Sequence, residues 1–354
     1  MADLNDKLPF TLPERPQVRR IRKVDAAIPT PTTQSQPMAG FEPRFTDIVD
    51  YIVRITDEIW TDRAIGYIRE TYDAACTVYS SYGVVRSAEA VVKSTIAGIA
   101  AVPDGDTNHL NVAWSGNDEQ GFYTAHLGYG GGINRVATAY GPATGRRYAN
   151  RFAADCISRA NRIHTEWLVR DTGACVRQLG FDLDDAGRVM AEMPLGEAYI
   201  QTPGHGMLPA VSHNAGSLEA WAQALFDGVW NERRLDRLSS FYAPDVIAHS
   251  GGGRTLQGLG ALSTLIVQLL ASIPDGNLDI GHVCWSQEND GVIVAVRWTL
   301  SGSSARGGLL GNQWPAGRQV FMMGSSHLRL EGPLIMEEWT VFDEVAVLAM
   351  AYRD

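Results

Sequence analysis

Two stretches of nine residues share the same pattern, and they constrain the fold more than any other feature of the chain. "IHTEWLVRD" begins at Ile163, and "IMEEWTVFD" begins at Ile335, 172 residues later. Ile, Glu, Trp and Asp occupy the same places in both stretches, and each stretch has the composition of a β-strand. A strand that recurs at this distance predicts two copies of one folding unit.

The flanking sequence repeats in the same order, with a separation that stays between 170 and 172 residues. The matched positions are Trp60 and Trp230, Tyr72 and Tyr242, Val102 and Ile273, Trp114 and Trp285, and Gly121 and Gly291. We therefore predict four segments: a flexible N-terminal arm or tail (1–40), a first domain (41–194), a linker (195–216) and a second domain (217–354).

Each copy begins with helical periodicity and continues with strand patterns. "FTDIVDYIVRITDEIW" and "SLEAWAQALFDGVW" place apolar residues three and four positions apart, and Ser217 is suited to cap the second helix. Later segments are β-rich, whereas "GYGGGINR" is interpreted as a loop or bulge. Helices followed by a series of antiparallel strands predict an α+β fold, with the helices packed on one face of the sheet.

Composition excludes several classes of protein. The net charge of −10 disfavours binding to nucleic acid, and the basic run Arg19–Lys23 is interpreted as a solvated or subunit-contacting segment. No apolar run approaches the roughly 20 residues needed to span a bilayer, and no signal pattern opens the chain, so we expect a cytoplasmic protein without membrane contact. The four cysteines form no CxxC pair and are expected to be reduced.

At this point the repeat resembles a known family. The order of helix, short strand, helix ending at Pro-Asp, and sheet closing on E-x-W-x-x-x-D resembles the nuclear transport factor 2-like superfamily, in particular its SnoaL-like polyketide cyclase branch. The second copy fits through Phe241–Val246, Pro274–Asp275, Gly291–Trp298 and Glu338–Asp343, while the first lacks the Pro-Asp of the "YAPDV" strand. The resemblance implies two cones, each with helices wrapped by a strongly curved sheet around an apolar pocket. It also implies a homo-oligomer and a reaction without metal or organic cofactor.

Candidate catalytic residues follow from the resemblance and from polar side chains on the strands. The resemblance implies an acid–base role for Asp171 and Asp343; alternatively, each caps its strand end or pairs with an arginine. His126 is notable because the second copy has Val296 at the same place. His327 precedes the strand of Asp343 and could pair with it. The remaining candidates for proton transfer are His164, His249 and Tyr79.

Aromatic residues near these positions suit an aromatic substrate, although they equally suit a plain core. The candidate substrate-binding residues are Trp114, Tyr123, Trp167, Trp285, Trp339 and Arg159. We therefore predict a cofactor-independent acid–base enzyme acting on a small aromatic molecule. Tandem chains of this size resemble lyases that release formaldehyde from lignin-derived diarylpropane diols to give stilbenes. The alternatives are a polyketide-type aldol cyclase, a dehydratase or isomerase, or a non-catalytic ligand-binding or assembly module. No HExxH motif, nucleophile elbow or 2-His-1-carboxylate spacing is evident.

Overall fold

The computed structural model describes residues 5–16, 18, 34–193, 216–287 and 291–353. The basic run Arg19–Lys23 and nearly all of the predicted linker lie outside these residues, so nothing follows here for either. The described part forms two similar series of helices and strands, which we call the first and second copy.

The first copy starts with a helix that runs into a π-helical turn and ends with two helices that follow the last strand. Its elements are α2 (Ile48–Thr56), η1 (Asp57–Thr61), η2 (Ile65–Tyr67), α3 (Ile68–Thr71), β1 (Tyr72–Ser80), β2 (Gly83–Arg86), α4 (Ala88–Ala101), β3 (Asp106–Asn117), β4 (Gly121–Ile133), β5 (Arg147–Arg159), β6 (Arg162–Arg170), α5 (Thr172–Leu179) and α6 (Leu183–Glu192).

The second copy follows the same order, and its first helix is capped as predicted, with the Ser217 hydroxyl accepting from the Ala220 amide at 3.1 Å. Its elements are α7 (Leu218–Phe226), η3 (Asp227–Asn231), η4 (Leu235–Ser240), β7 (Tyr242–Ser250), β8 (Arg254–Gln257), α8 (Gly258–Ser272), β9 (Asn277–Gln287), β10 (Val292–Ser303), η5 (Gly308–Leu310), β11 (Gln319–Glu331), β12 (Leu334–Phe342) and α9 (Glu344–Tyr352).

The twelve strands in the described part of the chain form one sheet in the order β2-β1-β6-β5-β4-β3-β9-β10-β11-β12-β7-β8. The order is symmetric about the junction of β3 and β9: each strand of the first copy and its counterpart in the second copy lie equally far from this junction. The two halves meet where β3 lies against β9, and the paired residues there are Trp114 and Trp285, which occupy equivalent places in the repeat. We call this junction the seam. Only β1 with β6 and β7 with β12 run parallel, so the sheet is mainly antiparallel and the fold is α+β.

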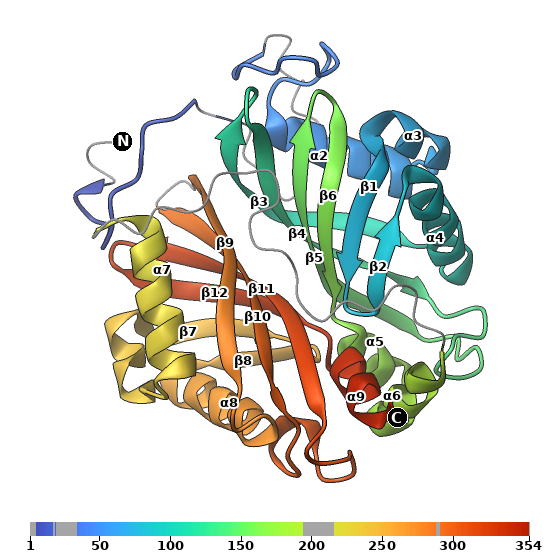
Figure 1. Cartoon of the computed structure of the whole chain (residues 1–354), viewed down its shortest axis with the longest axis vertical. Helices are drawn as coiled ribbons and strands as arrows, with labels where there is room; N and C mark the ends of the chain where they lie inside the picture. The colour runs from blue at the N-terminus through green and yellow to red at the C-terminus, as the bar shows by residue number, and fades with distance from the viewer. Residues whose placement is uncertain (1–4, 17, 19–33, 194–215, 288–290, 354) are drawn as a thin grey trace.

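Figure 1 shows the helices α2 to α4 on the outer side of the first copy and α7 and α8 on the outer side of the second. Between helices and strands lie two separate cores, which we call the first cone (with Phe45, Ile52 and Phe122) and the second cone (with Leu269 and Trp298). A third cluster, the intersheet layer, gathers side chains of both copies on the opposite sheet face, including Ala125, Ile157, Ala295, Met323 and Val341. Strands of both copies are therefore covered on two sides.

The glycine-rich run is not the predicted loop, because it continues β4 as far as Ile133. The glycines are needed for close packing against the neighbouring strand and turn. A Cβ atom on Gly131 would lie 2.2 Å from the Tyr148 carbonyl oxygen, and one on Gly132 would lie 2.5 Å from a Val102 methyl group. Side chains larger than hydrogen would force these segments apart.

The predicted flexible arm also differs from what its described part shows. Residues 5–16, called the arm below, pack on the second copy of the same chain, where Phe10 and Leu12 are buried in the second cone's core. The Phe10 ring lies 5.0 Å from the ring of Trp221 on α7, and Thr11 bridges to Ser217. Leu8, Phe10 and Leu12 are apolar residues at alternate positions, and they account for the packing of the arm on the second copy. The prediction of a flexible arm did not take this pattern into account.

Candidate functional site

The first cone contains a chain of titratable side chains that leads from its interior to the surface. His126, buried on β4, places Nε2 at 2.8 Å from Nδ1 of His109 on β3. The other nitrogen of His109, Nε2, lies 2.8 Å from the Asp57 carboxylate, which is partly exposed at the start of the π-helical turn η1. A bulge in β3 at Leu110 turns His109 toward His126.

The two hydrogen bonds fix which ring nitrogens carry protons. The Asp57 carboxylate can only accept, so His109 carries its proton on Nε2. Nδ1 of neutral His109 is then an acceptor, and it receives a hydrogen bond from Nε2–H of His126. This assignment leaves Nδ1 of His126 unprotonated, with a lone pair available to take up a proton.

Burial controls the charge state of His126. Loss of solvent lowers its pKa well below 6.5, and the neighbouring His109 and His327 rings act in the same direction. His126 is therefore neutral in the folded protein. A proton gained at Nδ1 would be unfavourable there unless Nε2–H moved to His109, where Asp57 faces the resulting cation.

A buried carboxyl group lies on the same inner face of the sheet. Glu166 on β6 accepts a hydrogen bond from the Tyr72 hydroxyl at 3.0 Å, and burial raises its pKa. His126 pairs with Ala154 and Glu166 with Cys156, two positions apart on the intervening strand β5. Two strand spacings of about 4.8 Å each and an offset of about 6.6 Å along the strand place the backbones of His126 and Glu166 about 12 Å apart.

The second cone keeps the Glu–Tyr pair but locks it into a closed hydrogen-bond network. Glu338 accepts from the Tyr242 hydroxyl at 2.8 Å and from the Thr340 hydroxyl at 2.5 Å. The Ser326 hydroxyl lies 2.7 Å from the Thr340 oxygen, and it accepts from the Trp298 indole N–H at 3.0 Å. Each polar group of this network has a partner, so the network serves packing and stability.

In the first cone the same three positions cannot continue such a network, because Thr340, Ser326 and Trp298 correspond to Leu168, Ala154 and Gly128. Conversely, His109 and His126 correspond to Ile280 and Val296 in the second copy. Polar groups that could act on a ligand are thus concentrated in the first cone.

The large aromatic side chain that fills the centre of each cone comes from different, non-equivalent strands in the two copies. In the second cone Trp298 on β10 covers Gly324 on β11, where a Cβ atom would lie 2.2 Å from the indole. In the first cone Phe152 on β5 covers Gly128 on β4, where a Cβ atom would lie 2.6 Å from the ring. With Trp298 in place, the cavity of the second cone measures about 30 Å³, enough for a water molecule but not for an aromatic substrate.

The two strand-end aspartates, both predicted as catalytic, each cap a helix. Asp171 accepts from the Ala174 amide at the start of α5 and from the amides of Gly252 and Gly253 in the second copy, at 3.0, 2.7 and 2.9 Å. Asp343 accepts from the Ala346 amide at the start of α9 and from the Thr172 hydroxyl at 2.5 Å. The alternative of a capping role is therefore what the geometry supports.

The other predicted proton-transfer residues lie outside both cones. His327 is on the strand next to Asp343, as expected, but its ring faces the intersheet layer and contacts the Asn111 side chain at 2.5 Å, and burial lowers its pKa to about 3. His249 contacts Thr255 and Glu337 near a sheet edge. His164 lies 3.7 Å from Asp73.

Several predicted aromatic residues face the other copy rather than a pocket. In the intersheet layer Tyr79 stacks on Trp167 with ring centroids 5.7 Å apart. The Tyr123 hydroxyl donates to Asp155 at 2.6 Å and accepts from the Arg297 guanidinium at 3.0 Å. These groups hold the two copies together, because Arg297 comes from the second copy.

The remaining predicted binding residues are dispersed. Trp339 stacks on His249 with ring centroids 5.8 Å apart, and Arg159 is exposed at the end of β5. Trp114 and Trp285 meet at the seam. Of the thirteen predicted site residues, Trp114 belongs to the core of the first cone and His126 contributes to the chain that leads through His109 to Asp57.

Sequence reasoning missed Asp57, His109, Glu166 and Tyr72. Glu166 belongs to the repeated stretch of nine residues. Both Glu166 and Tyr72 recur at matching positions of the second copy, as Glu338 and Tyr242, and this recurrence was a usable signal. His109 gave no signal because the bulge at Leu110 breaks the alternation that assigns a face. Within the part of the chain that the structure describes, no three His, Cys, Asp or Glu side chains gather as a metal-binding group, and no helix could span a membrane. All four cysteines are free and buried.

Comparison with known proteins gives a family match for the second copy. The model of the SnoaL-like polyketide cyclase family matches residues 220–350. A search of curated proteins found no match.

Solved structures similar to this chain include a SnoaL-like polyketide cyclase from Jannaschia sp. CCS1 (17% identity, 38% of this chain and 92% of that one, TM-score 0.33). They also include IdmH, described as a polyketide cyclase from Streptomyces antibioticus (22%, 38% and 97%, TM-score 0.31), and TsrD from Streptomyces laurentii (17%, 38% and 96%, TM-score 0.32).

Proposed function

We propose that the protein is a cofactor-independent acid–base enzyme whose reaction takes place in the first cone, on a small molecule of largely apolar character. The observation that carries this proposal is the buried His126 with its connection through His109 to Asp57, which the second copy lacks. The match of the second copy to SnoaL-like polyketide cyclases supports the reaction class.

In this proposal His126 is the general base. Nδ1 removes a proton from a carbon or hydroxyl group of the substrate while Nε2–H passes to Nδ1 of His109. The cation then forms on His109, where its Nε2–H already contacts the Asp57 carboxylate, rather than on His126 in an apolar core. Proton removal is thereby coupled to a charge that the protein can stabilise.

Glu166 is the general acid. Its raised pKa favours the protonated form compared with an exposed glutamate, so it can donate a proton to a carbonyl or leaving oxygen on the opposite side of the substrate. Tyr72 orients the carboxyl group through its hydrogen bond. Arg170 at the end of β6 lies near the Trp60 ring, with 5.9 Å between the guanidinium carbon and the ring centroid.

This pair of groups suits aldol cyclisation, isomerisation and dehydration, each of which needs one proton removed and another supplied. Loss of formaldehyde from a diarylpropane diol needs the same two transfers and remains the sharpest hypothesis about the substrate. In that reaction His126 would deprotonate the terminal hydroxyl, the carbon–carbon bond would break, and Glu166 would protonate the departing benzylic oxygen.

The test is a substrate screen with the full chain and no added cofactor. A racemic diarylpropane diol is followed by formaldehyde release and stilbene absorbance, and a linear β-diketone ester by chromatography of cyclised product. Glu166→Gln and Glu338→Gln form a matched pair, since both glutamates accept from a tyrosine. We expect turnover to fall at least a hundredfold in the first variant and to persist in the second.

The result that contradicts the proposal is equal loss in both variants, or loss only in Glu338→Gln, with both proteins folded by circular dichroism. Formaldehyde and stilbene in equal amounts would identify the lyase. Cyclised product from the ester alone would identify the cyclase and remove the lyase hypothesis. If a ligand binds but neither substrate turns over in any variant, the binding-module alternative replaces the enzyme.

A further inference from the structure

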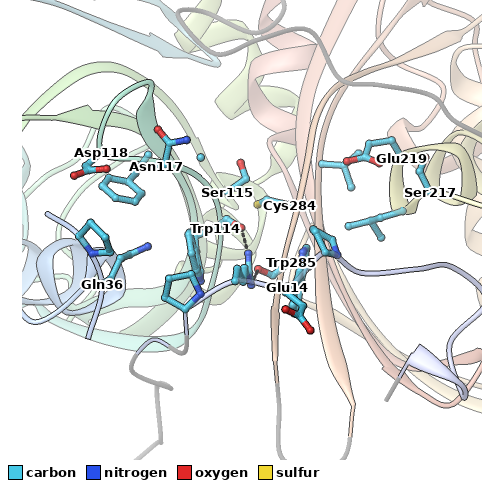
Figure 2. Close-up of a pocket in the computed structure, with 18 of the residues that line it drawn as sticks. Glu14, Gln36, Trp114, Ser115, Asn117, Asp118, Ser217, Glu219, Cys284 and Trp285 are labelled. Atoms are coloured by element: carbon cyan, nitrogen blue, oxygen red, sulfur yellow. Dashed lines mark hydrogen bonds between the residues drawn. The ribbon is translucent and has the colours of Figure 1, made fainter. Parts of the chain in front are cut away.

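A cavity lined by described residues of both copies lies at the seam. It has a volume of about 700 Å³, within the range of small-molecule sites. Figure 2 shows Trp114 and Trp285 entering it from the two copies, with Asn117 and Asp118 at one end and Ser217 and Glu219 at the other. The arm crosses this groove at Arg15.

Arg15 is held between the two seam tryptophans. Its guanidinium carbon lies 3.5 Å from the Trp285 ring centroid and 4.1 Å from that of Trp114. Nη1 donates to the Trp114 carbonyl oxygen at 2.6 Å, and Nη2 donates to that of Trp285. Because these two residues are equivalent in the repeat, one cation joins both copies and the arm at a single point.

The positive charge of Arg15 lacks an anionic partner. Two of its five N–H donors bond to carbonyl oxygens, and within the described part of the chain no carboxylate forms an ion pair with it. Burial without a counter-charge lowers its pKa to about 9. The Trp114 indole N–H, on the same groove-lining residue that stacks on Arg15, is buried and has no acceptor. Both groups favour a ligand that brings a negatively charged acceptor.

We propose that the seam groove binds a small aromatic monocarboxylate, with its carboxylate on Arg15 and its ring on the apolar lining of the groove. Trp114, Trp285 and Phe122 are nearly buried there, and the exposed Pro13, Pro16 and Pro37 provide apolar surface for the ring. A carboxylate matches the unused guanidinium N–H donors.

The groove also restricts the charge of the ligand. Glu14, Asp118 and Glu219 line it, and their carboxylates repel phosphate and other multiply charged anions. A single carboxylate can contact Arg15 and keep the rest of the ligand neutral. The groove shares Trp114 and Phe122 with the core of the first cone but none of the residues of the His126–His109–Asp57 chain, so it does not depend on the proposed reaction.

Calorimetric titration of the full chain tests the proposal, with benzoate as the probe, benzyl alcohol as its neutral analogue and inorganic phosphate as a more highly charged anion. We expect benzoate to bind at least tenfold more tightly than either. Arg15→Gln should weaken benzoate binding at least tenfold, because a hydrogen bond to a charged group contributes about 1.5–3 kcal/mol. Arg15→Lys should restore part of it. Trp114→Phe, which keeps an aromatic ring but removes the N–H, should weaken binding by a smaller factor of about three to ten.

Arg188→Gln is the matched control, since this exposed arginine pairs with Asp185 far along the chain and should leave affinity unchanged. His126→Val should likewise bind benzoate normally, which separates this site from the first cone. Equal affinity for benzoate and benzyl alcohol, unchanged affinity in Arg15→Gln, or loss of benzoate binding in His126→Val would each overturn the proposal. Absence of benzoate binding at millimolar concentration would do so as well.

Discussion

The first and second cones share one architecture and differ in how they use a buried glutamate. In the second cone Glu338 receives hydrogen bonds from Tyr242 and Thr340, and the network continues to Ser326 and Trp298. In the first cone Glu166 keeps only the tyrosine of this set. The second cone therefore has a closed, stabilising hydrogen-bond network around its glutamate, whereas the first cone has only part of that network.

The first cone has a polar chain of its own that the second cone lacks. His126, His109 and Asp57 occupy positions where the second copy has Val296, Ile280 and Asp227. The Asp227 side chain bonds to Gln223 and Asn231, so the aspartate is shared by both copies and the two histidines are the difference. Variants that exchange residues between the cones therefore test the comparison directly.

The largest effect is expected from His126→Val, which gives the first cone the residue of the second. Turnover of the substrate found by the screen should fall by about 10²–10⁴, the usual contribution of a general base. The protein should remain folded because valine occupies the equivalent place at Val296. Val296→Ala is the control: it should lower stability and leave turnover intact. Retained turnover in His126→Val would place the reaction elsewhere.

Asp57 acts through His109 and is expected to have a smaller catalytic effect. Asp57→Asn keeps the shape but removes the charge that faces the protonated His109, so turnover should fall by about tenfold and the pH dependence of kcat/KM should shift. An unchanged pH profile would mean that Asp57 has only a structural role. The readout is a profile of kcat/KM between pH 5 and 9.

The comparison also explains what the sequence could and could not predict. The sequence pattern predicted the strand that carries Trp167, but it could not say what covers the face on which Trp167 lies. The second copy covers it, through Arg297 on β10, whose guanidinium carbon lies 3.9 Å from the Trp167 ring. Trp167 and Tyr123, which the sequence analysis proposed as substrate-binding residues, lie in the intersheet layer. The His126 prediction rested on a difference between the copies, which is independent of what covers either face.

The exchange of aromatic residues between strands should produce the next largest effect. Trp298→Gly should lower the free energy of unfolding by about 3–5 kcal/mol, because it empties the centre of the second cone. Gly324→Phe alone should also destabilise, since a side chain there meets the indole. The double variant reproduces the arrangement of Gly128 and Phe152, so it should recover part of the loss. Urea unfolding of the wild type, the two single variants and the double variant gives the coupling energy. If the effects of the two substitutions simply add, the new phenylalanine does not compensate for the missing tryptophan.

The strand-end aspartates differ in their response to pH. Burial raises the pKa of Asp343 from 3.8 to about 7. Between these values the folded protein keeps a proton that the unfolded chain releases, so this group lowers stability as the pH rises from about 4 to 7, with no further change above. Asp343→Asn should remove this slope and stabilise the protein at pH 8 by a few kcal/mol, since one pKa unit corresponds to about 1.4 kcal/mol.

Asp171→Asn is the matched variant and should behave differently. One oxygen of Asp171 accepts from Gly253, and the other accepts from Ala174 and Gly252. An asparagine amide would oppose one of these N–H groups, so the variant should be less stable by about 1–3 kcal/mol near neutral pH. Thermal unfolding between pH 4 and 8 separates the two outcomes. A slope that persists in Asp343→Asn would assign the pH dependence to another group.

The smallest effect is expected from exchanging Ser326 with its counterpart Ala154. Ser326→Ala leaves the Trp298 N–H without an acceptor inside a buried core, and it removes a partner of Thr340, so the free energy of unfolding should fall by about 1–3 kcal/mol. Ala154→Ser should not raise the free energy of unfolding. The first cone has Gly128 and Leu168 in place of Trp298 and Thr340, so the added hydroxyl does not find the partners that Ser326 has. Turnover should survive Ser326→Ala, because the network holds the second cone together without contacting a substrate. A loss of turnover without a loss of stability would reverse the roles of the two cones.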